Sequence, residues 1–267
     1  MFSDYLERWE LTPDGDPIVT PTSRLLPVRR SGSPAMLKLA VHPEEQRGNR
    51  LMTQWDGNGA ARVLMHAGDA ILMERAAQGI SLADLARNGR DDEASRIICA
   101  TVVRLHARGK PPPDLVKDLI ALTRWFESLK HAADRHGGIL RLCATTASEL
   151  LATPKDVMML HGDIHHGNVL DFGPRGWLVI DPKGLIGEHV FDYANLFCNP
   201  DAQTATSPGR LARQADVVAT AAALDRSRLL RWILAYAGLS AAFSMEDGAS
   251  PTAALTVAEL AAAELSR

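Results

Sequence analysis

Hydrophobic residues change their spacing along the chain near Glu74. Before that point, short apolar segments are separated by turn-forming residues, as at 31–34 (Ser-Gly-Ser-Pro), and the run at 35–40 has the composition of a strand. After Gly79, apolar residues recur three and four positions apart, and Ser81 stands where a helix cap is expected. The pattern therefore predicts a β-rich N-terminal part followed by a mainly helical part.

Several segments of the second part carry the helical spacing. Three helices are expected at 94–106, 229–243 and 253–265, and two more within 115–152, divided at its adjacent glycines. The Lys-Pro-Pro-Pro sequence at 110–113 should end the first of these helices. A hairpin is also predicted, with strands at residues 169–170 and 177–180 around the glycine-containing turn at residues 172–176.

The composition excludes several classes of protein. With 267 residues the chain can form one large domain or two lobes, and a net charge of -3 gives no basic surface for nucleic acid or an anionic membrane. The apolar stretch at 232–245 is too short to cross a bilayer, and the N-terminus lacks the features of a secretory signal. The cysteines Cys99, Cys143 and Cys198 form no CxxC pair, which suggests buried thiols in a reducing compartment. We therefore expect a cytoplasmic protein that acts on a small molecule.

Residues 161–168 read His-Gly-Asp-Ile-His-His-Gly-Asn and precede an apolar run that ends at Asp181. The spacing of Asp163, Asn168 and Asp181 is that of a phosphoryl-transfer site, H-x-D-x-x-x-x-N followed by a metal-binding Asp. In such a site Asp163 faces the substrate hydroxyl, whereas Asn168 and Asp181 converge on a Mg²⁺ ion that bridges the nucleotide phosphates. Mg²⁺ prefers oxygen ligands and keeps waters and phosphate oxygens around it, so two protein ligands suffice.

The histidines of this segment allow two other interpretations. His161 can be buried and brace the loop without touching substrate, and we favour that role. Alternatively, His161, His165 and His166 could form a zinc cluster, since histidines four residues apart share one face of a helix. Gly162 and Gly167 argue against a helix, and no further His or Cys stands nearby at ligand spacing. Zinc is therefore the weaker alternative.

A lysine on an apolar strand supplies the nucleotide side of the predicted site. Lys38 lies in the strand at 35–40, where its stem would follow apolar surface and its ammonium would reach the α- and β-phosphates. Glu44 and Glu45 follow at a helix start, and we select Glu45 as the ion-pair partner, because apolar residues within 51–55 would form the buried face of that helix. The alternative is a solvated lysine and two solvated glutamates, which the dipole of a helix start already favours.

The strand that ends near Ala76 is expected to lead into the connection between two lobes. Backbone groups of Glu74 and Ala76 are where an adenine would pair, with Met73 beside its ring. Any core strand that leads to a loop has the same pattern, so this assignment depends on the other motifs. It divides the chain into a nucleotide-binding lobe at 1–76 and a helical lobe at 77–267 that holds the catalytic loop and the substrate site.

Together these motifs resemble the aminoglycoside phosphotransferase family of protein-kinase-like small-molecule kinases. The similarity runs from Lys38 through residues 161–168 and 177–182 to the Phe-Asp-Tyr-Ala-Asn sequence at 191–195. The resemblance implies an α+β, bilobal protein-kinase-like fold, with ATP and Mg²⁺ as cofactors and a cationic aminoglycoside as partner. Direct transfer of the γ-phosphoryl group of ATP to a hydroxyl is the mechanism it implies.

One branch of this family is the most similar. The paired histidines of the catalytic segment, together with residues 231–235 and 238–242, resemble the branch that phosphorylates streptomycin at its 6-hydroxyl and is grouped with hydroxyurea-resistance kinases. The resemblance therefore implies inactivation of an antibiotic. General kinase motifs alone do not select the substrate.

The resemblance assigns a role to five positions. Asp163 matches the catalytic base, Asn168 and Asp181 match the metal ligands, and Lys38 matches the phosphate-binding lysine. Asp192 matches a residue that braces the catalytic loop.

Two features depart from the protein-kinase pattern. The segment expected to cover the phosphates, at 20–24, has no glycine, so closure over ATP must use Ser and Thr hydroxyls and free backbone amides. Asp181 is followed by Pro182 and Lys183 instead of Phe-Gly, so the regulatory flip of a phenylalanine is not expected. Lys183 is then either an additional phosphate contact or an exposed side chain.

The acceptor is less well defined than the phosphate donor. Streptomycin carries guanidinium groups, which carboxylates bind in bidentate fashion, and Glu188, Glu246 and Asp247 are candidates on the helical side. Kinases of choline, a homoserine-like amino alcohol, a sugar or hydroxyurea would need the same catalytic core. An inactive nucleotide-binding module is a further alternative, but it would be expected to have lost one of the catalytic or metal-binding residues, and none is lost.

Overall fold

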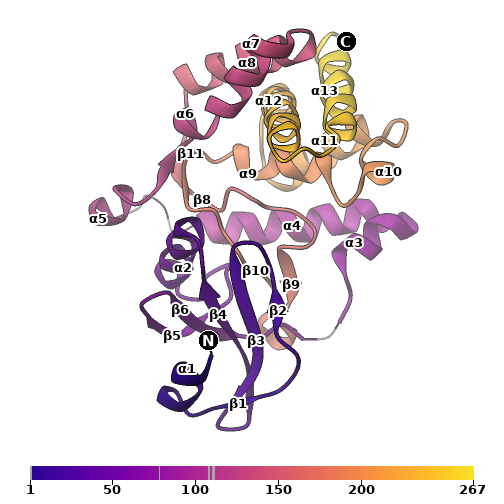
Figure 1. Cartoon of the computed structure of the whole chain (residues 1–267). Coiled ribbons are helices and arrows are strands. Elements are labelled where there is room, and N and C mark those ends of the chain that lie inside the picture. Colours follow the sequence, from indigo (N-terminus) through magenta and orange to yellow (C-terminus); the bar gives the residue numbers. More distant parts are fainter. Residues whose placement is uncertain (1, 78, 108, 110–111) are drawn as a thin grey trace.

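The first part of the chain folds into an antiparallel sheet whose side chains alternate between two faces. The computed structural model describes residues 2–77, 79–107, 109 and 112–267. Its first sheet has the strand order β1-β3-β4-β6-β5, and β2 pairs with β3 (Figure 1). The strand bounds are β1 Leu11–Pro13, β2 Ile18–Val19, β3 Ser23–Arg30, β4 Ser33–Ala40, β5 Val63–Ala67 and β6 Ala70–Glu74.

Strand β4 shows why Lys38 faces inward. Leu37 and Leu39 pack with Trp9, which follows helix α1 (Ser3–Arg8), in an apolar cluster on one face of the sheet. Because successive side chains of a strand point to opposite faces, Lys38 points to the other face, where it meets helix α2 (Pro43–Trp55). Only 4% of Lys38 is exposed. The alternation of side chains along β4 therefore places Lys38 against α2.

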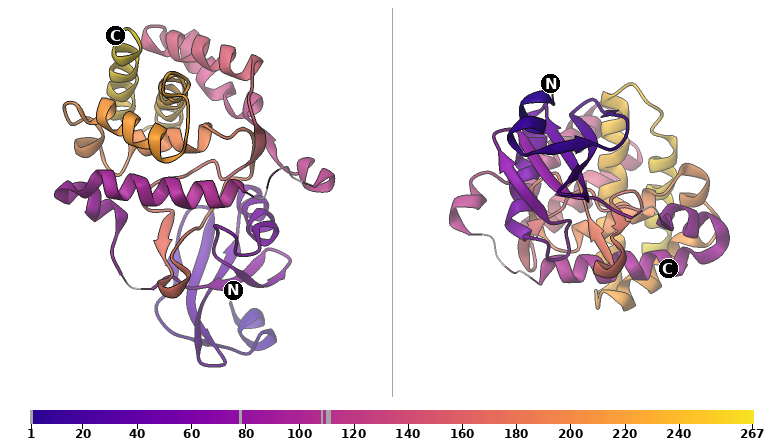
Figure 2. Two further views of the ribbon diagram at one scale, coloured as in Figure 1. Left: turned by 180° about the vertical axis from the view of Figure 1, so that it is seen from behind. Right: turned by 90° about the horizontal axis from the view of Figure 1, so that it is seen from below.

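The second part is mainly helical, and helix α4 crosses the molecule between the sheet and the remaining helices (Figures 1 and 2). The helix bounds are α3 Leu82–Leu85, α4 Asp91–His106, α5 Pro113–Val116, α6 Leu122–Trp125, α7 Glu127–His136, α8 Ile139–Ala152, α9 Phe191–Ala194, α10 Ala202–Ala205, α11 Arg210–Ala221, α12 Arg226–Glu246 and α13 Thr252–Leu265. The five short strands are β7 Ile120–Ala121, β8 Val157–Leu160, β9 Val169–Asp171, β10 Trp177–Val179 and β11 Leu185–Glu188.

Helix α12 lies at the centre of the helical part. Its Trp232 is fully buried and contacts the rings of Phe126 and Phe191. At Gly238 the helix approaches α8 so closely that a Cβ atom would overlap the side chain of Cys143. Large aromatic side chains and one glycine thus fix the position of α12, the helix that also carries one wall of the site described below.

Most predicted elements of this part are confirmed. The helices predicted at 94–106, 229–243 and 253–265 are α4, α12 and α13, and β9 pairs with β10 as the predicted antiparallel hairpin. Two glycines with positive φ, Gly137 and Gly138, separate α7 from α8 at the predicted point. The proposed helix stop at 110–113 lies partly outside the described residues. No helix among the described residues is both long and apolar enough to cross a membrane.

One helix prediction was wrong at its start. The first helix of the segment 115–152 was expected to begin near its first residue, but α7 begins at Glu127. Residues Ile120–Ala121 form β7 instead, which pairs with β11, and β11 pairs in turn with β8. Neither β8 nor β11 was predicted, because these short strands are stabilised by partners far away in the sequence and lack a periodicity of their own.

Candidate active site

Asp192 of α9 anchors the loop between β8 and β9. Its Oδ1 accepts a hydrogen bond from the Gly162 N–H at 2.7 Å, and its Oδ2 accepts one from the His161 N–H at 2.9 Å. His106, at the end of α4, places Nε2 2.9 Å from the same Oδ2. Asp192 is buried, so these contacts replace water. The contribution of His106 was not predicted, because no sequence pattern links residues that are 86 positions apart.

His161 lies inside the protein. Its Nδ1 accepts a hydrogen bond from the Asp163 N–H at 3.2 Å, and its Nε2 lies 2.7 Å from the carbonyl oxygen of Ile180. Its ring stacks on Trp55, with the ring centroids 6.2 Å apart. Burial lowers the pKa of His161, so the neutral ring donates from Nε2 to Ile180. These contacts engage both ring nitrogens inside the protein and fit the loop-bracing role.

Asp163 is held by two asparagines. Its Oδ1 accepts from Asn195 Nδ2 at 2.9 Å, and Asn168 Nδ2 donates to its carbonyl oxygen at 2.9 Å. The same Asn168 nitrogen lies 3.4 Å from Asp163 Oδ2. About a quarter of the Asp163 side chain is exposed, 27%. Asn195 belongs to the segment that carried the family resemblance, but its contact with Asp163 was not predicted.

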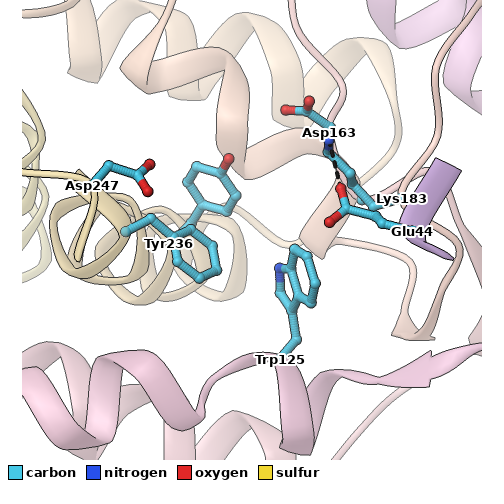
Figure 3. Close-up of a pocket in the computed structure, with 8 residues that line it drawn as sticks. Glu44, Trp125, Asp163, Lys183, Tyr236 and Asp247 are labelled. Atoms are coloured by element: carbon cyan, nitrogen blue, oxygen red, sulfur yellow. Dashed lines mark ion pairs between the residues drawn. The ribbon is translucent and has the colours of Figure 1, made fainter. Parts of the chain in front are cut away.

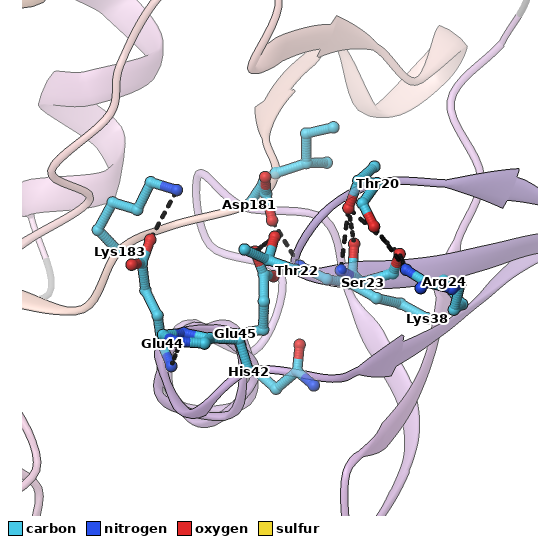
Figure 4. Close-up of polar contacts among 12 residues, drawn as sticks. Thr20, Thr22, Ser23, Arg24, Lys38, His42, Glu44, Glu45, Asp181 and Lys183 are labelled. Carbon is cyan, nitrogen blue, oxygen red and sulfur yellow. Dashed lines mark hydrogen bonds and ion pairs between the residues drawn. The ribbon is translucent and has the colours of Figure 1, made fainter. Parts of the chain in front are cut away.

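Lys38, Glu45 and Asp181 form an ion-paired group on the side of the sheet (Figure 4). Lys38 Nζ lies 2.5 Å from Asp181 Oδ1 and also pairs with Glu45, the glutamate selected from the sequence. Asp181 has the left-handed backbone angle φ 63°, which turns the chain directly after β10. Burial alone would raise the pKa of Asp181, but attraction to Lys38 holds it below its usual value.

Helix α2 also contacts the residues that follow Asp181 (Figure 4). Glu44 Oε1 pairs with Lys183 Nζ at 2.8 Å. One helical turn later, Gly48 lies so close to the chain that a Cβ atom would overlap the carbonyl oxygen of Pro182. The two neighbouring glutamates therefore have different partners, and Lys183 is paired with Glu44 rather than free on the surface.

The glycine-free segment at 20–24, whose last two residues begin β3, is held together by hydrogen bonds of its own side chains. Thr20 Oγ1 accepts from the Ser23 N–H at 2.9 Å, and Arg24 Nη1 donates to the Thr20 carbonyl oxygen at 2.5 Å. Thr22 Oγ1 donates to Glu45 Oε1 at 2.8 Å. These hydroxyl groups thus bind other groups of the protein, and that of Thr22 connects the segment to Glu45, the partner of Lys38.

The predicted adenine-binding residues lie at the end of β6. Met73 is buried, and the Glu74 N–H already donates to the Arg62 carbonyl oxygen at 3.0 Å. The Glu74 carboxylate pairs with Arg175. Among the described residues, no hydrogen bond engages the backbone of Ala76. The role of these residues in adenine binding and the lobe boundary after Ala76 stay predictions.

A cavity of about 360 Å³ opens beside Asp163 (Figure 3). Its walls come from α2, α6, the catalytic loop, the segment after Asp181, and α12 with the residue that follows it. The residues that matter for its chemistry are Glu44, Trp125, Asp163, Lys183, Tyr236 and Asp247. Aromatic side chains, including Phe243, and carboxylates from opposite sides therefore surround a space next to the predicted base.

The three carboxylates proposed for the acceptor have different surroundings. Asp247 lines the cavity. Glu246 instead accepts from Ser128 Oγ at 3.2 Å outside it. Glu188 is 1% exposed and pairs with Arg228 at 2.5 Å, so the interpretation of Glu188 as an acceptor contact is wrong. Its charge is already compensated inside the protein. Glu44, which lies on the sheet side and was considered only for Lys38, lines the cavity instead.

The zinc interpretation is not supported by the positions of the histidines. His161 contacts Ile180, His165 lies 4.0 Å from Asp163, and His166 is buried with both ring nitrogens unpartnered among the described residues. In the part of the chain that the structure describes, no group of three His, Cys, Asp or Glu side chains is placed to hold a metal ion.

Comparison with known proteins decides the family. The sequence pattern of the family described as aminoglycoside/hydroxyurea antibiotic resistance kinase matches residues 8–248. The chain belongs to this family. A streptomycin 3''-kinase of Klebsiella pneumoniae is 51% identical over 249 residues, which cover 91% of this chain and 92% of that protein. A streptomycin 6-kinase of Streptomyces griseus is 31% identical over 272 residues, which cover 97% of this chain and 86% of that protein.

Solved structures agree on the fold. A thermostable mutant of aminoglycoside phosphotransferase APH(4)-Ia, in ternary complex with ADP and hygromycin B, has a TM-score of 0.59 and 14% sequence identity. The match covers 97% of this chain and 94% of that one. The predicted protein-kinase-like fold, with a β-rich N-terminal part and a helical remainder, is therefore confirmed. The chain is a phosphotransferase of the aminoglycoside kinase type, and its named relatives differ in the hydroxyl they specify.

Proposed function

We propose that the protein transfers the γ-phosphoryl group of ATP to a hydroxyl group of streptomycin. The position of Asp163 is the observation that carries this proposal. Asp163 lines the acceptor cavity, and Lys183, which lines it too, is attracted by both Asp163 and Asp181. The predicted base and the carboxylate expected on the phosphate side therefore lie within electrostatic reach of one ammonium group, as transfer between two substrates requires.

In this mechanism Asp163 orients the acceptor hydroxyl. As the hydroxyl oxygen forms its bond to the γ-phosphorus, Asp163 accepts the proton, and ADP leaves with the electrons of the broken bond. Asn195 and Asn168 hold Asp163 in place by the hydrogen bonds described above. Lys38, whose present partners are Glu45 and Asp181, neutralises negative charge on the phosphates.

Asp181 and Asn168 are the residues that would hold Mg²⁺. Both present oxygen atoms, which this ion prefers. The Asn168 amide nitrogen donates to Asp163, so its amide oxygen is left for a metal ion. Mg²⁺ would supply further neutralisation of the phosphate charge.

Streptomycin fits the chemistry of the cavity. Its guanidinium groups would pair with the carboxylates of Glu44 and Asp247, and its rings would pack on Trp125 and Tyr236. The family description also includes hydroxyurea, but a small neutral molecule would leave both carboxylates unused. A cationic acceptor is therefore favoured over hydroxyurea and over uncharged sugars.

The hydroxyl that receives the phosphate is proposed from the relatives. The streptomycin 3''-kinase is 51% identical to this chain, whereas the two streptomycin 6-kinases are 31% and 30% identical. We therefore place the 3''-hydroxyl first. The 6-hydroxyl, which was expected from the resemblance of the sequence, is the second candidate.

Mass spectrometry of streptomycin incubated with protein, Mg²⁺ and ATP tests this function. We expect one added phosphate, and phosphorus–proton NMR of the product identifies the phosphorylated hydroxyl. Asp163→Ala should lower kcat by roughly 10²- to 10⁴-fold, because general-base catalysis contributes about that much. Asp134→Ala, an exposed carboxylate on α7, is the control. An unphosphorylated antibiotic, or unchanged turnover by Asp163→Ala, would contradict the proposal.

A further inference from the structure

The ion pair between Glu44 and Lys183 lies on the wall of the acceptor cavity (Figure 3). The two charged atoms are 2.8 Å apart, and 22% and 24% of the two side chains are exposed, with Lys183 the more exposed. Glu44 comes from α2 on the sheet side, and Lys183 follows Asp181. A cationic acceptor entering the cavity therefore meets a carboxylate that another cation already occupies.

A guanidinium group is a better partner for Glu44 than the lysine is. Its planar pair of N–H donors matches both oxygens of a carboxylate, whereas an ammonium acts as a point charge. About three quarters of each side chain is buried, so the two charges can separate at low cost only when each meets another opposite charge. When a guanidinium group of the acceptor replaces the Lys183 ammonium as the partner of Glu44, Glu44 therefore gains a hydrogen bond and its carboxylate stays paired.

The Lys183 ammonium has other carboxylates nearby when the acceptor binds Glu44. Its ammonium is attracted by Asp163 and Asp181 as well as by Glu44. The backbone of Lys183 is fixed, because its N–H donates to the His161 carbonyl oxygen at 2.7 Å. Only the flexible side chain has to turn. Its ammonium would then lie between the predicted base and the predicted metal ligand, where the transferred phosphoryl group passes.

We propose that the Glu44–Lys183 pair is an exchange site, in which the cationic acceptor replaces Lys183 at Glu44 and thereby releases Lys183 to bind the transferred phosphoryl group. This inference rests on the proposed function. Glu44 is then a specificity-determining residue for cationic acceptors, and Lys183 a contact of the phosphoryl group. Acceptor binding and phosphate stabilisation are coupled, because one ammonium serves two partners in turn.

The exchange makes an unusual prediction for Lys183→Met. Removing the competing ammonium frees Glu44, so streptomycin should bind roughly threefold more tightly in calorimetry without nucleotide, as expected for a partly exposed ion pair. The same variant should lose at least about tenfold in kcat, since the phosphoryl group loses a charged hydrogen bond. Glu44→Gln should weaken streptomycin binding by roughly tenfold and leave the KM for ATP unchanged.

Asp118→Asn is the matched control. It removes the ion pair between Asp118 and Arg50, which joins α2 to the second part at 2.6 Å but lies outside the residues of the cavity. Its streptomycin affinity and kcat should equal those of the unaltered protein. If Lys183→Met binds streptomycin more weakly or equally well, the exchange is overturned. If the unaltered protein neither binds nor phosphorylates streptomycin, the proposed function itself fails, and the two failures are thereby distinguished.

Discussion

The catalytic loop, residues 161–168, and the ion-paired residues around α2 are held by different kinds of interaction. In the catalytic loop, backbone amides and neutral side chains make the contacts: Asp192 binds two N–H groups, and the Asn195 amide holds Asp163. Around α2, oppositely charged side chains pair with one another, as in Lys38 with Asp181 on the nucleotide side and Lys183 with Glu44 on the wall of the cavity. The contacts that brace the loop are made within the protein, whereas the ion pairs consist of charges that ligands also bind.

This difference separates what is fixed before ligands bind from what changes afterwards. The buried hydrogen bonds from the loop to Asp192 have no competing partner in the substrates, so the loop that carries the predicted base keeps its position. Each ion pair around α2 contains a group that a phosphate, Mg²⁺ or a cationic acceptor would bind instead. We therefore expect substitutions of residues that brace the catalytic loop, such as Asp192, to act mainly on stability, and substitutions around α2 to act mainly on kinetics.

The largest effect is expected for Asp192→Asn. An amide offers one acceptor oxygen and places an NH₂ group against donors, so one of the His161 and Gly162 N–H groups is left unpaired inside the protein. The free energy of unfolding should fall by about 3 kcal/mol or more. Urea denaturation measures this, with exposed Asp134→Asn as the control. A loss below about 1 kcal/mol would mean that the loop does not depend on this anchor.

His166→Leu tests whether the catalytic loop tolerates charge. Burial, with Arg210 nearby, lowers the pKa of His166 from 6.5 to about 4, and neither ring nitrogen has a partner among the described residues. Between these two pH values the unfolded chain binds the proton and the folded one does not, so stability is lost as the pH falls. This residue contributes up to about 3 kcal/mol to that loss.

Between pH 7 and 4.5, the free energy of unfolding should therefore fall less steeply with pH for His166→Leu than for the unaltered protein. His136→Leu, which changes an exposed histidine on α7, should leave the slope unchanged. Other buried histidines such as His161 have lowered pKa values and contribute in the same direction, so the difference between the two proteins isolates His166. Equal slopes would contradict the proposed burial of a neutral ring.

Gly48→Ala should separate kinetics from stability. In an ordinary helix this change stabilises by about 1 kcal/mol, but here the new Cβ meets the Pro182 carbonyl oxygen and pushes α2 away from the segment after Asp181. We expect kcat/KM for ATP to fall by about tenfold, with a net loss of stability below about 2 kcal/mol. Thr53→Ala, on the exposed side of the same helix, is the control. Unchanged kinetics would show that the contact between α2 and Pro182 is dispensable.

The smallest effect is expected for Thr22→Val. The variant removes the hydroxyl that donates to Glu45 Oε1 and leaves the Lys38 pair in place. Loss of one such hydrogen bond is worth about 1 kcal/mol, so KM for ATP should rise roughly fivefold with little change in kcat. Steady-state kinetics with Thr12→Val as the control would test this. An unchanged KM would show that Thr22 does not support ATP binding.

The sequence predicted those residues and elements that follow a recognisable spacing along the chain. Asp163, Asn168 and Asp181 follow a catalytic pattern, Lys38 lies on an apolar strand, and the helical spacing located α4, α12 and α13. These predictions depend on local order along the chain. Strands β8 and β11 were missed because their stability comes from pairing across the fold.

Only the tertiary structure decided which charges meet. The sequence selected Glu45 as the partner of Lys38 and assigned no partner to Glu44, and the turn of α2 directs Glu45 to Lys38 and Glu44 to Lys183. It also left Glu188 and Asp247 as equal candidates, although Glu188 is neutralised inside the helical part and Asp247 lines the cavity. The reason is physical: the type of a residue sets the chemistry it can perform, but burial and the distance to an opposite charge decide whether that chemistry is available.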